Sequence, residues 1–120
     1  MSGEKVKEFQ AYRDRQNERL LGQNNLVINR LFNLDSRVYE DGALNKSTKE
    51  LMGLVASLVL RCDDCVNYHL LQCHDLEISD DQLFESFSIA LMVGGSITIP
   101  HLRRATEFWD NLKIPEDEKE

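Results

Sequence analysis

Apolar residues recur at helical spacing along most of this chain, and no stretch alternates between apolar and polar residues as a half-buried strand does. A charged first helix is expected at about residues 4–21, and Gly22 follows it. A second helix is expected from four apolar residues at spacings of four, three and four: Val27, Leu31, Leu34 and Val38. The pattern therefore favours an all-α protein.

Two later helix starts carry capping boxes, in which a serine and a glutamate or glutamine three residues on bond each other's backbone N–H groups. Ser47 and Glu50 predict the start of a third helix, which is apolar on nearly all sides through Leu60. Such a helix is expected at the centre of the fold or of an oligomer. Ser79 and Gln82 predict the start of a fifth helix.

Asp63 and Asp64 can cap and favour the start of a fourth helix that runs to about His74. Pro100 fits the first turn of a last helix. We therefore expect one all-α domain of about six helices over residues 1–120, with a solvated acidic tail at about 113–120. A C-x-x-C pair, Cys62 and Cys65, lies at the start of a central helix in this scheme.

Composition narrows the class of protein. Hydrophobic residues make up 42% of the 120 residues and charged residues 29%, which is typical of a globular domain. The formal net charge is −7 and no basic stripe is present, so we expect no nucleic-acid partner. The longest apolar stretch, residues 51–60, is about half the length that a membrane-spanning helix needs, and no secretory leader is evident. We expect a cytoplasmic protein, and in that reducing compartment a close cysteine pair is more often catalytic or metal-binding than a permanent staple.

The cysteine pair and one histidine form the main chemical candidate. Cys62, Cys65 and His69 are separated by three and four residues, which places them on one stripe of a helix. Cysteines at such spacing in a first turn have Cα atoms about 5–6 Å apart, within disulfide range. N–H groups at a helix start can stabilise a thiolate, and an imidazole can take its proton. Asp63 and Asp64 oppose this by raising the thiol pKa, unless solvent or Arg61 screens their charge.

Other interpretations remain open for the cysteines. Two buried, inert thiols would give the same C-x-x-C spacing, and Cys73 is more simply a small buried residue than a third redox thiol. A zinc site would need ligands within about 2.0–2.3 Å of the ion, whereas residues 62 to 73 span about 16 Å along a helix. No second C-x-x-C is present, so we expect neither a metal nor a cofactor.

Glu50 also has two interpretations. It is the third residue of the predicted capping box with Ser47, which is a structural role. It could instead polarise His69 or relay a proton, but the two groups could never meet if their helices formed one continuous rod. The functional interpretation therefore requires the chain to turn sharply at about residues 61–63.

Eleven residues separate Glu50 from the Cys62-Asp63-Asp64-Cys65 segment, and three residues separate that segment from His69. This arrangement resembles the E-x11-C-x-x-C-x3-H signature of AhpD-like alkylhydroperoxidases. These proteins belong to the carboxymuconolactone decarboxylase superfamily. The resemblance runs from about Phe32 to Trp109 and includes Lys49-Glu50-Leu51 and Met92-Val93-Gly94-Gly95. It implies an all-helical fold that assembles into homo-oligomers, commonly hexamers or trimers, and a dithiol peroxidase activity.

Carried over by position, the resemblance implies that Cys65 attacks the peroxide and becomes a sulfenic acid, which Cys62 resolves to a Cys62–Cys65 disulfide. His69 would assist deprotonation and Glu50 would complete the proton relay. A lipoyl or thioredoxin-like protein would then restore the thiols. Asp64 stands where the best-known peroxidases of the family carry a second histidine, so this relay differs from theirs.

Our first hypothesis is a thiol-dependent oxidoreductase that reduces peroxides or exchanges disulfides through Cys62 and Cys65. One alternative is a non-enzymatic oligomeric redox sensor or scaffold whose thiols switch without turnover. Another is a lyase of the carboxymuconolactone decarboxylase type, which the cysteine pair disfavours because the decarboxylases of the superfamily lack it.

Overall fold

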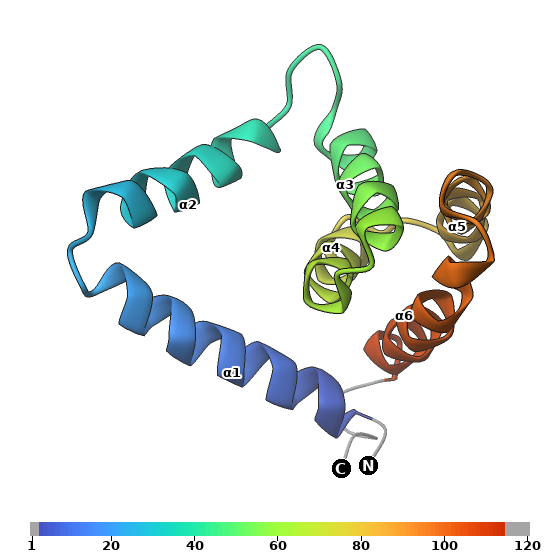
Figure 1. Ribbon diagram of the computed structural model, residues 1–120, viewed down its shortest axis with the longest axis horizontal. Coiled ribbons are helices and arrows are strands. Elements are labelled where there is room, and N and C mark those ends of the chain that lie inside the picture. Colours follow the sequence, from blue (N-terminus) through green and yellow to red (C-terminus); the bar gives the residue numbers. More distant parts are fainter. Residues whose placement is uncertain (1–2, 115–120) are drawn as a thin grey trace.

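The computed structural model describes residues 3–114 and is built from six α-helices (Figure 1). They are α1 (Glu4–Leu21), α2 (Leu26–Val38), α3 (Lys46–Leu60), α4 (Asp63–Asp75), α5 (Asp80–Gly94) and α6 (Ile99–Leu112). A short 3-10 helix, η1 (Ser96–Thr98), joins α5 to α6. Residues 3–114 contain no strand, so the predicted all-α, single-domain fold is confirmed. Of the predicted acidic tail at about 113–120, the residues from 115 on lie outside the described range.

The predicted Ser47–Glu50 capping box is wrong, whereas the Ser79–Gln82 box is confirmed. Helix α3 begins two residues earlier than predicted, because the Asn45 side chain accepts a hydrogen bond from the N–H of Thr48 at 2.8 Å. In the second box, Ser79 Oγ accepts from the N–H of Gln82 at 3.2 Å, and Gln82 Oε1 accepts from the N–H of Ser79 at 2.9 Å. The earlier start of α3 leaves the Glu50 side chain free to point into the protein.

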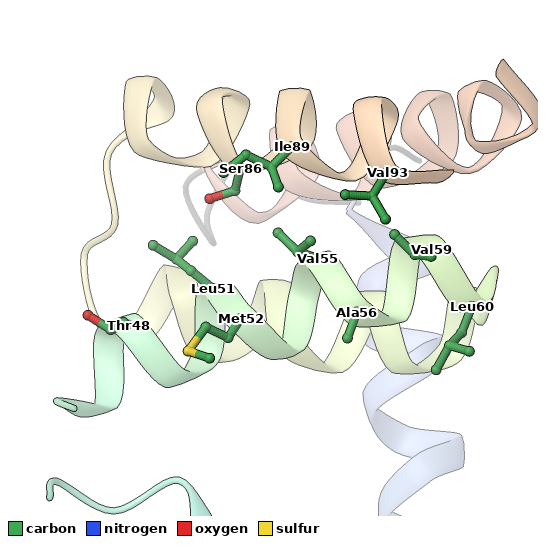
Figure 2. Close-up of a pocket in the computed structure, with 10 residues that line it drawn as sticks. All are labelled: Thr48, Leu51, Met52, Val55, Ala56, Val59, Leu60, Ser86, Ile89 and Val93. Atoms are coloured by element: carbon green, nitrogen blue, oxygen red, sulfur yellow. The ribbon is translucent and has the colours of Figure 1, made fainter. Parts of the chain in front are cut away.

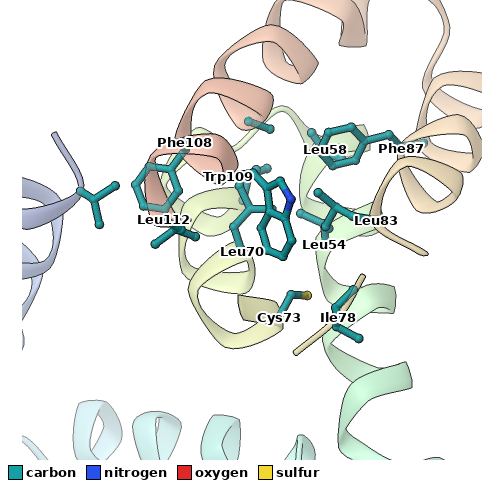
Figure 3. Packing of buried hydrophobic residues seen from close by; sticks show 14 residues of the cluster. Leu54, Leu58, Leu70, Cys73, Ile78, Leu83, Phe87, Phe108, Trp109 and Leu112 are labelled. Atoms are coloured by element: carbon teal, nitrogen blue, oxygen red, sulfur yellow. The ribbon is translucent and has the colours of Figure 1, made fainter. Parts of the chain in front are cut away.

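The hydrophobic core lies between α3, α4, α5 and α6 (Figure 3). Trp109 of α6 is its largest fully buried side chain, and its indole N–H donates to Asp80 Oδ1 at 2.8 Å. Burying each large apolar side chain contributes about 1.5–3 kcal/mol, so these four helices form the stable part of the fold. Its other fully buried apolar members are Val6, Leu54, Leu58, Val66, Leu70, Cys73, Leu83, Ala90 and Ala105.

Helices α1 and α2 form an arm that extends away from this core (Figure 1). Helix α1 is attached near its start, where Val6 is buried and the Phe9 ring packs edge-on against Phe108 with ring centroids 5.6 Å apart. Helix α2 buries none of its residues. The apolar stripe that predicted this helix is therefore exposed: Val27, Leu31, Leu34 and Val38.

A second uncovered apolar surface lies between α3 and α5 (Figure 2). Helix α3 buries Leu54 and Leu58 against the core, but its opposite side faces a groove of about 550 Å³. The apolar side chains that line this groove come from both helices: Leu51, Met52, Val55, Ala56, Val59, Leu60, Ile89 and Val93. Within residues 3–114, no helix is both long enough and apolar enough to cross a membrane.

Candidate functional site

A tight turn between α3 and α4 brings the predicted site residues together. Arg61 adopts the left-handed conformation (φ 62°, ψ 41°). Its N–H donates to the carbonyl of Leu58 and the N–H of Cys62 donates to the carbonyl of Ser57, both at 3.0 Å. This pair of bonds is the Schellman arrangement that ends helices. The chain therefore reverses after Leu60, and α4 packs back along α3, as the functional interpretation of Glu50 requires.

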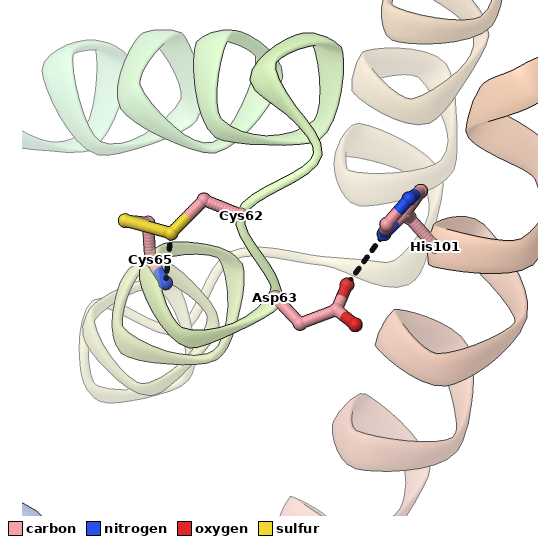
Figure 4. The surroundings of a disulfide bond; sticks show 4 residues. All are labelled: Cys62, Asp63, Cys65 and His101. Carbon is pink, nitrogen blue, oxygen red and sulfur yellow. Dashed lines mark hydrogen bonds and ion pairs between the residues drawn. A yellow bond between two sulfur atoms is a disulfide. The ribbon is translucent and has the colours of Figure 1, made fainter.

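Cys62 and Cys65 form a disulfide across the first turn of α4, with Cα atoms 5.3 Å apart (Figure 4). Cys62 is the N-cap residue, and its Sγ accepts a hydrogen bond from the N–H of Cys65 at 3.3 Å. The helix cap is thus a sulfur atom, while Asp63 and Asp64 lie in the first turn rather than at the cap. Cys62 is half-buried and Cys65 is exposed. An N–H donor and the helix start both favour the thiolate form of Cys62.

Glu50 and His69 form a buried pair one helical turn beyond the cysteines. His69 Nδ1 lies 2.7 Å from Glu50 Oε1, and the Glu50 side chain is fully buried. Because a carboxylate only accepts, Nδ1 carries the proton, and in the neutral imidazole Nε2 is then the acceptor nitrogen. The other carboxylate oxygen lies 3.3 Å from Lys46 Nζ. Cys65 precedes His69 by four residues, so the two side chains are neighbours on α4, with Cβ atoms about 5–6 Å apart.

Gly53 and Tyr39 complete the surroundings of His69, and neither was identified from the sequence. A Cβ at Gly53 would lie 2.8 Å from both His69 Nε2 and the Tyr39 hydroxyl oxygen, so the two polar atoms share the space that this glycine leaves. The Tyr39 and His69 rings lie 5.4 Å apart. Burial and the negative charge of Glu50 raise the pKa of Tyr39. A glycine inside a helical pattern was the available sequence signal for such a close approach.

Tyr39 is held in place by a lysine from the next helix. Lys49 Nζ donates to the carbonyls on both sides of Tyr39, to Val38 O at 2.9 Å and to Glu40 O at 2.6 Å. These bonds satisfy carbonyl groups at the end of α2 and tie that end to α3. The orientation of the Tyr39 ring therefore depends on a contact between the arm and the core helices.

Asp63 is bound by two residues of α6. His101 Nδ1 donates to Asp63 Oδ1 and Arg104 Nε donates to Asp63 Oδ2, each at 2.7 Å. Burial alone would raise the pKa of Asp63, but the hydrogen bonds from His101 and Arg104 outweigh it and hold the pKa below its usual value. Spacing in the sequence indicated no partner for His101, because this contact joins residues that are far apart along the chain.

Cys73 lies in the core and takes no part in this arrangement. It is a free, fully buried cysteine, and burial followed by the charge of Glu50 raises its pKa to about 12. A thiol with such a pKa is protonated and unreactive near neutral pH. In the described part of the chain, no group of three or more His, Cys, Asp or Glu side chains could hold a metal ion, so the zinc hypothesis gains no support.

The arrangement provides the parts that dithiol chemistry needs. The first two turns of α4 hold an exposed sulfur, that of Cys65, and a second sulfur at the helix start, that of Cys62. They also hold the His69 imidazole, whose orientation the buried Glu50 carboxylate fixes. A thiolate can form there, attack an acceptor and be captured by its neighbour. The four residues predicted from the sequence thus lie in one place, with Glu50 contributed by α3.

Comparisons with known proteins point to one family. A model of the carboxymuconolactone decarboxylase family matches residues 27–108. An uncharacterized protein of Cupriavidus necator is 30% identical over 73 residues, which are 61% of this chain and 65% of that protein, so the chain spans just under two thirds of its length. A second uncharacterized protein, encoded in the cox locus of Paracoccus denitrificans, is 25% identical over 66% of this chain and 71% of its own.

Solved structures share the same architecture. A Thermotoga maritima structure is 54% identical, with a TM-score of 0.84, and the match covers 88% of this chain and 90% of that one. It is described as a carboxymuconolactone decarboxylase family protein with a suggested involvement in the antioxidative response. A carboxymuconolactone decarboxylase family protein from Legionella pneumophila, 23% identical, shares the fold with a TM-score of 0.77 over 91% of this chain and 95% of its own.

Proposed function

Because the chain belongs to the carboxymuconolactone decarboxylase family, we propose that it is a thiol-dependent oxidoreductase that cycles Cys62 and Cys65 between dithiol and disulfide. The observation that carries this proposal is the placement of the pair at the start of α4, one turn from the buried Glu50–His69 pair. The substrate is a peroxide or a disulfide. The decarboxylases of the superfamily lack such a cysteine pair, so the Cys62–Cys65 pair disfavours a lactone decarboxylase activity.

With a peroxide, oxidation proceeds in two balanced steps. The Cys65 thiol transfers its proton to His69 Nε2, and the thiolate attacks one peroxide oxygen. The O–O bond breaks, Cys65 becomes a sulfenic acid, and the other oxygen leaves as an alcohol or water after taking up a proton. Cys62 then attacks the Cys65 sulfur, the disulfide forms and water is released. Glu50 holds the imidazole through its Nδ1–H and stabilises the charge that develops on it.

Reduction returns the pair to the dithiol at the expense of an external dithiol, for which we propose a lipoyl or thioredoxin-like protein. Cys65 is the exposed sulfur, so the incoming thiolate attacks there and forms a mixed disulfide. Cys62 leaves as a thiolate, which the N–H of Cys65 is placed to stabilise. A second attack, by the other thiol of the reductant, frees Cys65; the reductant has then given two electrons to the cysteine pair and leaves as a disulfide.

The test is dithiol-dependent consumption of hydrogen peroxide and of an alkyl hydroperoxide by purified protein. Cys65→Ser should abolish turnover, whereas Cys73→Ser should retain it because Cys73 is buried in the core. Equal turnover by the wild type and Cys65→Ser would overturn the assignment of Cys65. Reversible disulfide formation without peroxide turnover or disulfide exchange would instead identify a redox sensor.

We also propose that the chain forms a homo-oligomer, with hexamers or trimers expected from the family resemblance. Two apolar surfaces support this: the exposed stripe of α2 and the groove between α3 and α5. One chain carries both, so each can be covered by a second copy. Light scattering should give a multiple of the 13.9 kDa chain mass, and Leu31→Glu should lower it while Arg30→Glu does not. A mass of one chain for the wild type would refute the proposal.

A further inference from the structure

We propose that His101 and Arg104 of α6 are positioning residues for the cysteine pair. They hold and neutralise the Asp63 carboxylate, so that its negative charge does not oppose formation of the Cys62 thiolate. This inference deepens the proposed function and rests on it for its biological meaning. Its test reads the thiol itself and does not depend on turnover.

The geometry supports this role directly. Asp63 follows Cys62 in the chain and is the first residue of α4. Both of its carboxylate oxygens are occupied, one by His101 Nδ1 and the other by Arg104 Nε, each at 2.7 Å. The carboxylate is directed toward α6, while the two sulfurs lie on the other side of the helix start (Figure 4). The carboxylate of Asp63, the next residue after Cys62, thus points away from the sulfurs and is paired with His101 and Arg104.

The electrostatic consequence follows from the position of this carboxylate. An unpaired carboxylate beside a thiol raises the thiol pKa, because its negative charge repels the thiolate. It also offsets the positive potential at the helix start, which otherwise stabilises the thiolate. The other charged groups nearby do not replace the two donors. Lys5 of α1 lines a small cavity of about 190 Å³ together with Asp63 and Arg104, but it pairs with Glu107 at 3.7 Å. Asp64 and Arg61 are exposed to solvent, which screens them.

The sequence had raised this difficulty, because two aspartates beside the thiols oppose a reactive thiolate. Solvent or Arg61, the nearest cation along the chain, was the expected source of compensation. The compensation for Asp63 comes instead from α6. Its partners His101 and Arg104 lie 38 and 41 positions after Asp63 in the chain. Arg104 is about half exposed, with 55% of its side-chain surface accessible, so we expect a moderate effect rather than a large one.

The experiment measures the pKa of the Cys62 thiol from the pH dependence of its alkylation by iodoacetamide. It uses the full chain with Cys65→Ser, reduced, and mass spectrometry counts the alkyl groups. Arg104→Gln should raise the Cys62 pKa by about half a unit to one unit, which slows alkylation about three- to tenfold below that pKa. His101→Gln should shift it in the same direction. Adding Asp63→Asn to Arg104→Gln should return the pKa to the wild-type value or below.

Arg103→Gln is the matched control, because Arg103 is an exposed neighbour on the same helix with no ion pair among the described residues. If the ion pair only tied α4 to α6, adding Asp63→Asn would not restore the Cys62 pKa, because the double variant lacks both the Asp63 carboxylate and the Arg104 guanidinium. Equal Cys62 pKa values for Arg104→Gln and Arg103→Gln would overturn the inference, and so would a double variant that stays as high as Arg104→Gln. Should Arg104→Gln fail to fold by circular dichroism, His101→Gln and its double variant with Asp63→Asn decide the question in the same way. Lack of peroxide turnover and disulfide exchange with the pKa shifts intact would refute the proposed function alone.

Discussion

Replacing Gly53 by alanine tests whether the close approach of His69 and Tyr39 to α3 is required. An added Cβ would lie 2.6 Å from His69 Cε1 and 2.8 Å from both His69 Nε2 and the Tyr39 hydroxyl oxygen. Carbon atoms in contact normally lie about 3.5–4.0 Å apart, so these neighbours must move by close to 1 Å. The imidazole cannot withdraw without lengthening its 2.7 Å contact with the buried Glu50 carboxylate.

Two opposing effects set the size of the change. Alanine is favoured over glycine inside a helix by about 1 kcal/mol, which stabilises the variant. A hydrogen bond to a charged group contributes about 1.5–3 kcal/mol, and most of it is lost when His69 is displaced from Glu50. We therefore expect Gly53→Ala to lower the free energy of unfolding by about 0.5–2 kcal/mol. Urea unfolding followed by Trp109 fluorescence, at one fixed protein concentration, measures it.

A second readout separates the site from general stability. Displacement of His69 should slow alkylation of the reduced cysteine pair in native Gly53→Ala. Ala11→Gly, at an exposed position inside α1, should cost about 1 kcal/mol through helix propensity and leave the thiols unchanged. Tyr39→Phe removes one of the clashing atoms, so Gly53→Ala should cost less in that background. A Gly53→Ala protein that is more stable than the wild type, with unchanged thiol reactivity, would refute the reasoning.

Three further predictions concern the turn, the core and an ion pair at the protein surface. Arg61→Gly should raise the free energy of unfolding by about 0.5–1 kcal/mol, because glycine adopts the left-handed conformation without strain; urea unfolding checks this, and a decrease would contradict it. Iodoacetamide at pH 8 should label the reduced cysteine pair of the native protein but not Cys73, whose pKa burial raises to about 12; labelling of Cys73 before denaturation would argue against its burial. Hydrogen bonds from Lys113 and Trp109 lower the pKa of Asp80 in the folded protein. The ionised Asp80 therefore stabilises the fold above the unfolded-state pKa of about 4, and this contribution is lost as the pH falls through the lower folded-state pKa. Asp80→Asn should therefore flatten the fall of the urea midpoint as the pH drops below about 4, and an unchanged slope would count against the pairing.

The helices were predictable because each one leaves a pattern of apolar and capping residues within its own segment. Prediction failed where this pattern does not distinguish between the possible local structures. The stripe of α2 and the capping box of α5 each lie within one element, and both predictions hold. At α3, Asn45 and Ser47 are both competent caps, and the sequence alone does not rank them. Arg61 was not predicted in the left-handed conformation because residues other than glycine seldom adopt it.

The candidate site was predictable only in part for the same reason. Cys62, Cys65 and His69 follow from spacing within one helix, whereas the contact of Glu50 with His69 depends on the turn between two helices. The partners of Asp63 and the position of Tyr39 depend on packing between elements that are far apart in the chain. Such contacts have no local signal, since they are set by how the whole core closes.

The turn between α3 and α4 also fixes how many residues can separate Glu50 from Cys62. Each residue of a helix rotates the chain by about 100° and advances it by 1.5 Å. Deleting or inserting one residue between these positions would turn Glu50 away from His69, even if every remaining side chain were kept. The connection between α1 and α2 carries no such constraint on the site, so changes of length should be tolerated there. The eleven-residue interval is therefore a geometric requirement of two helices joined by one left-handed residue.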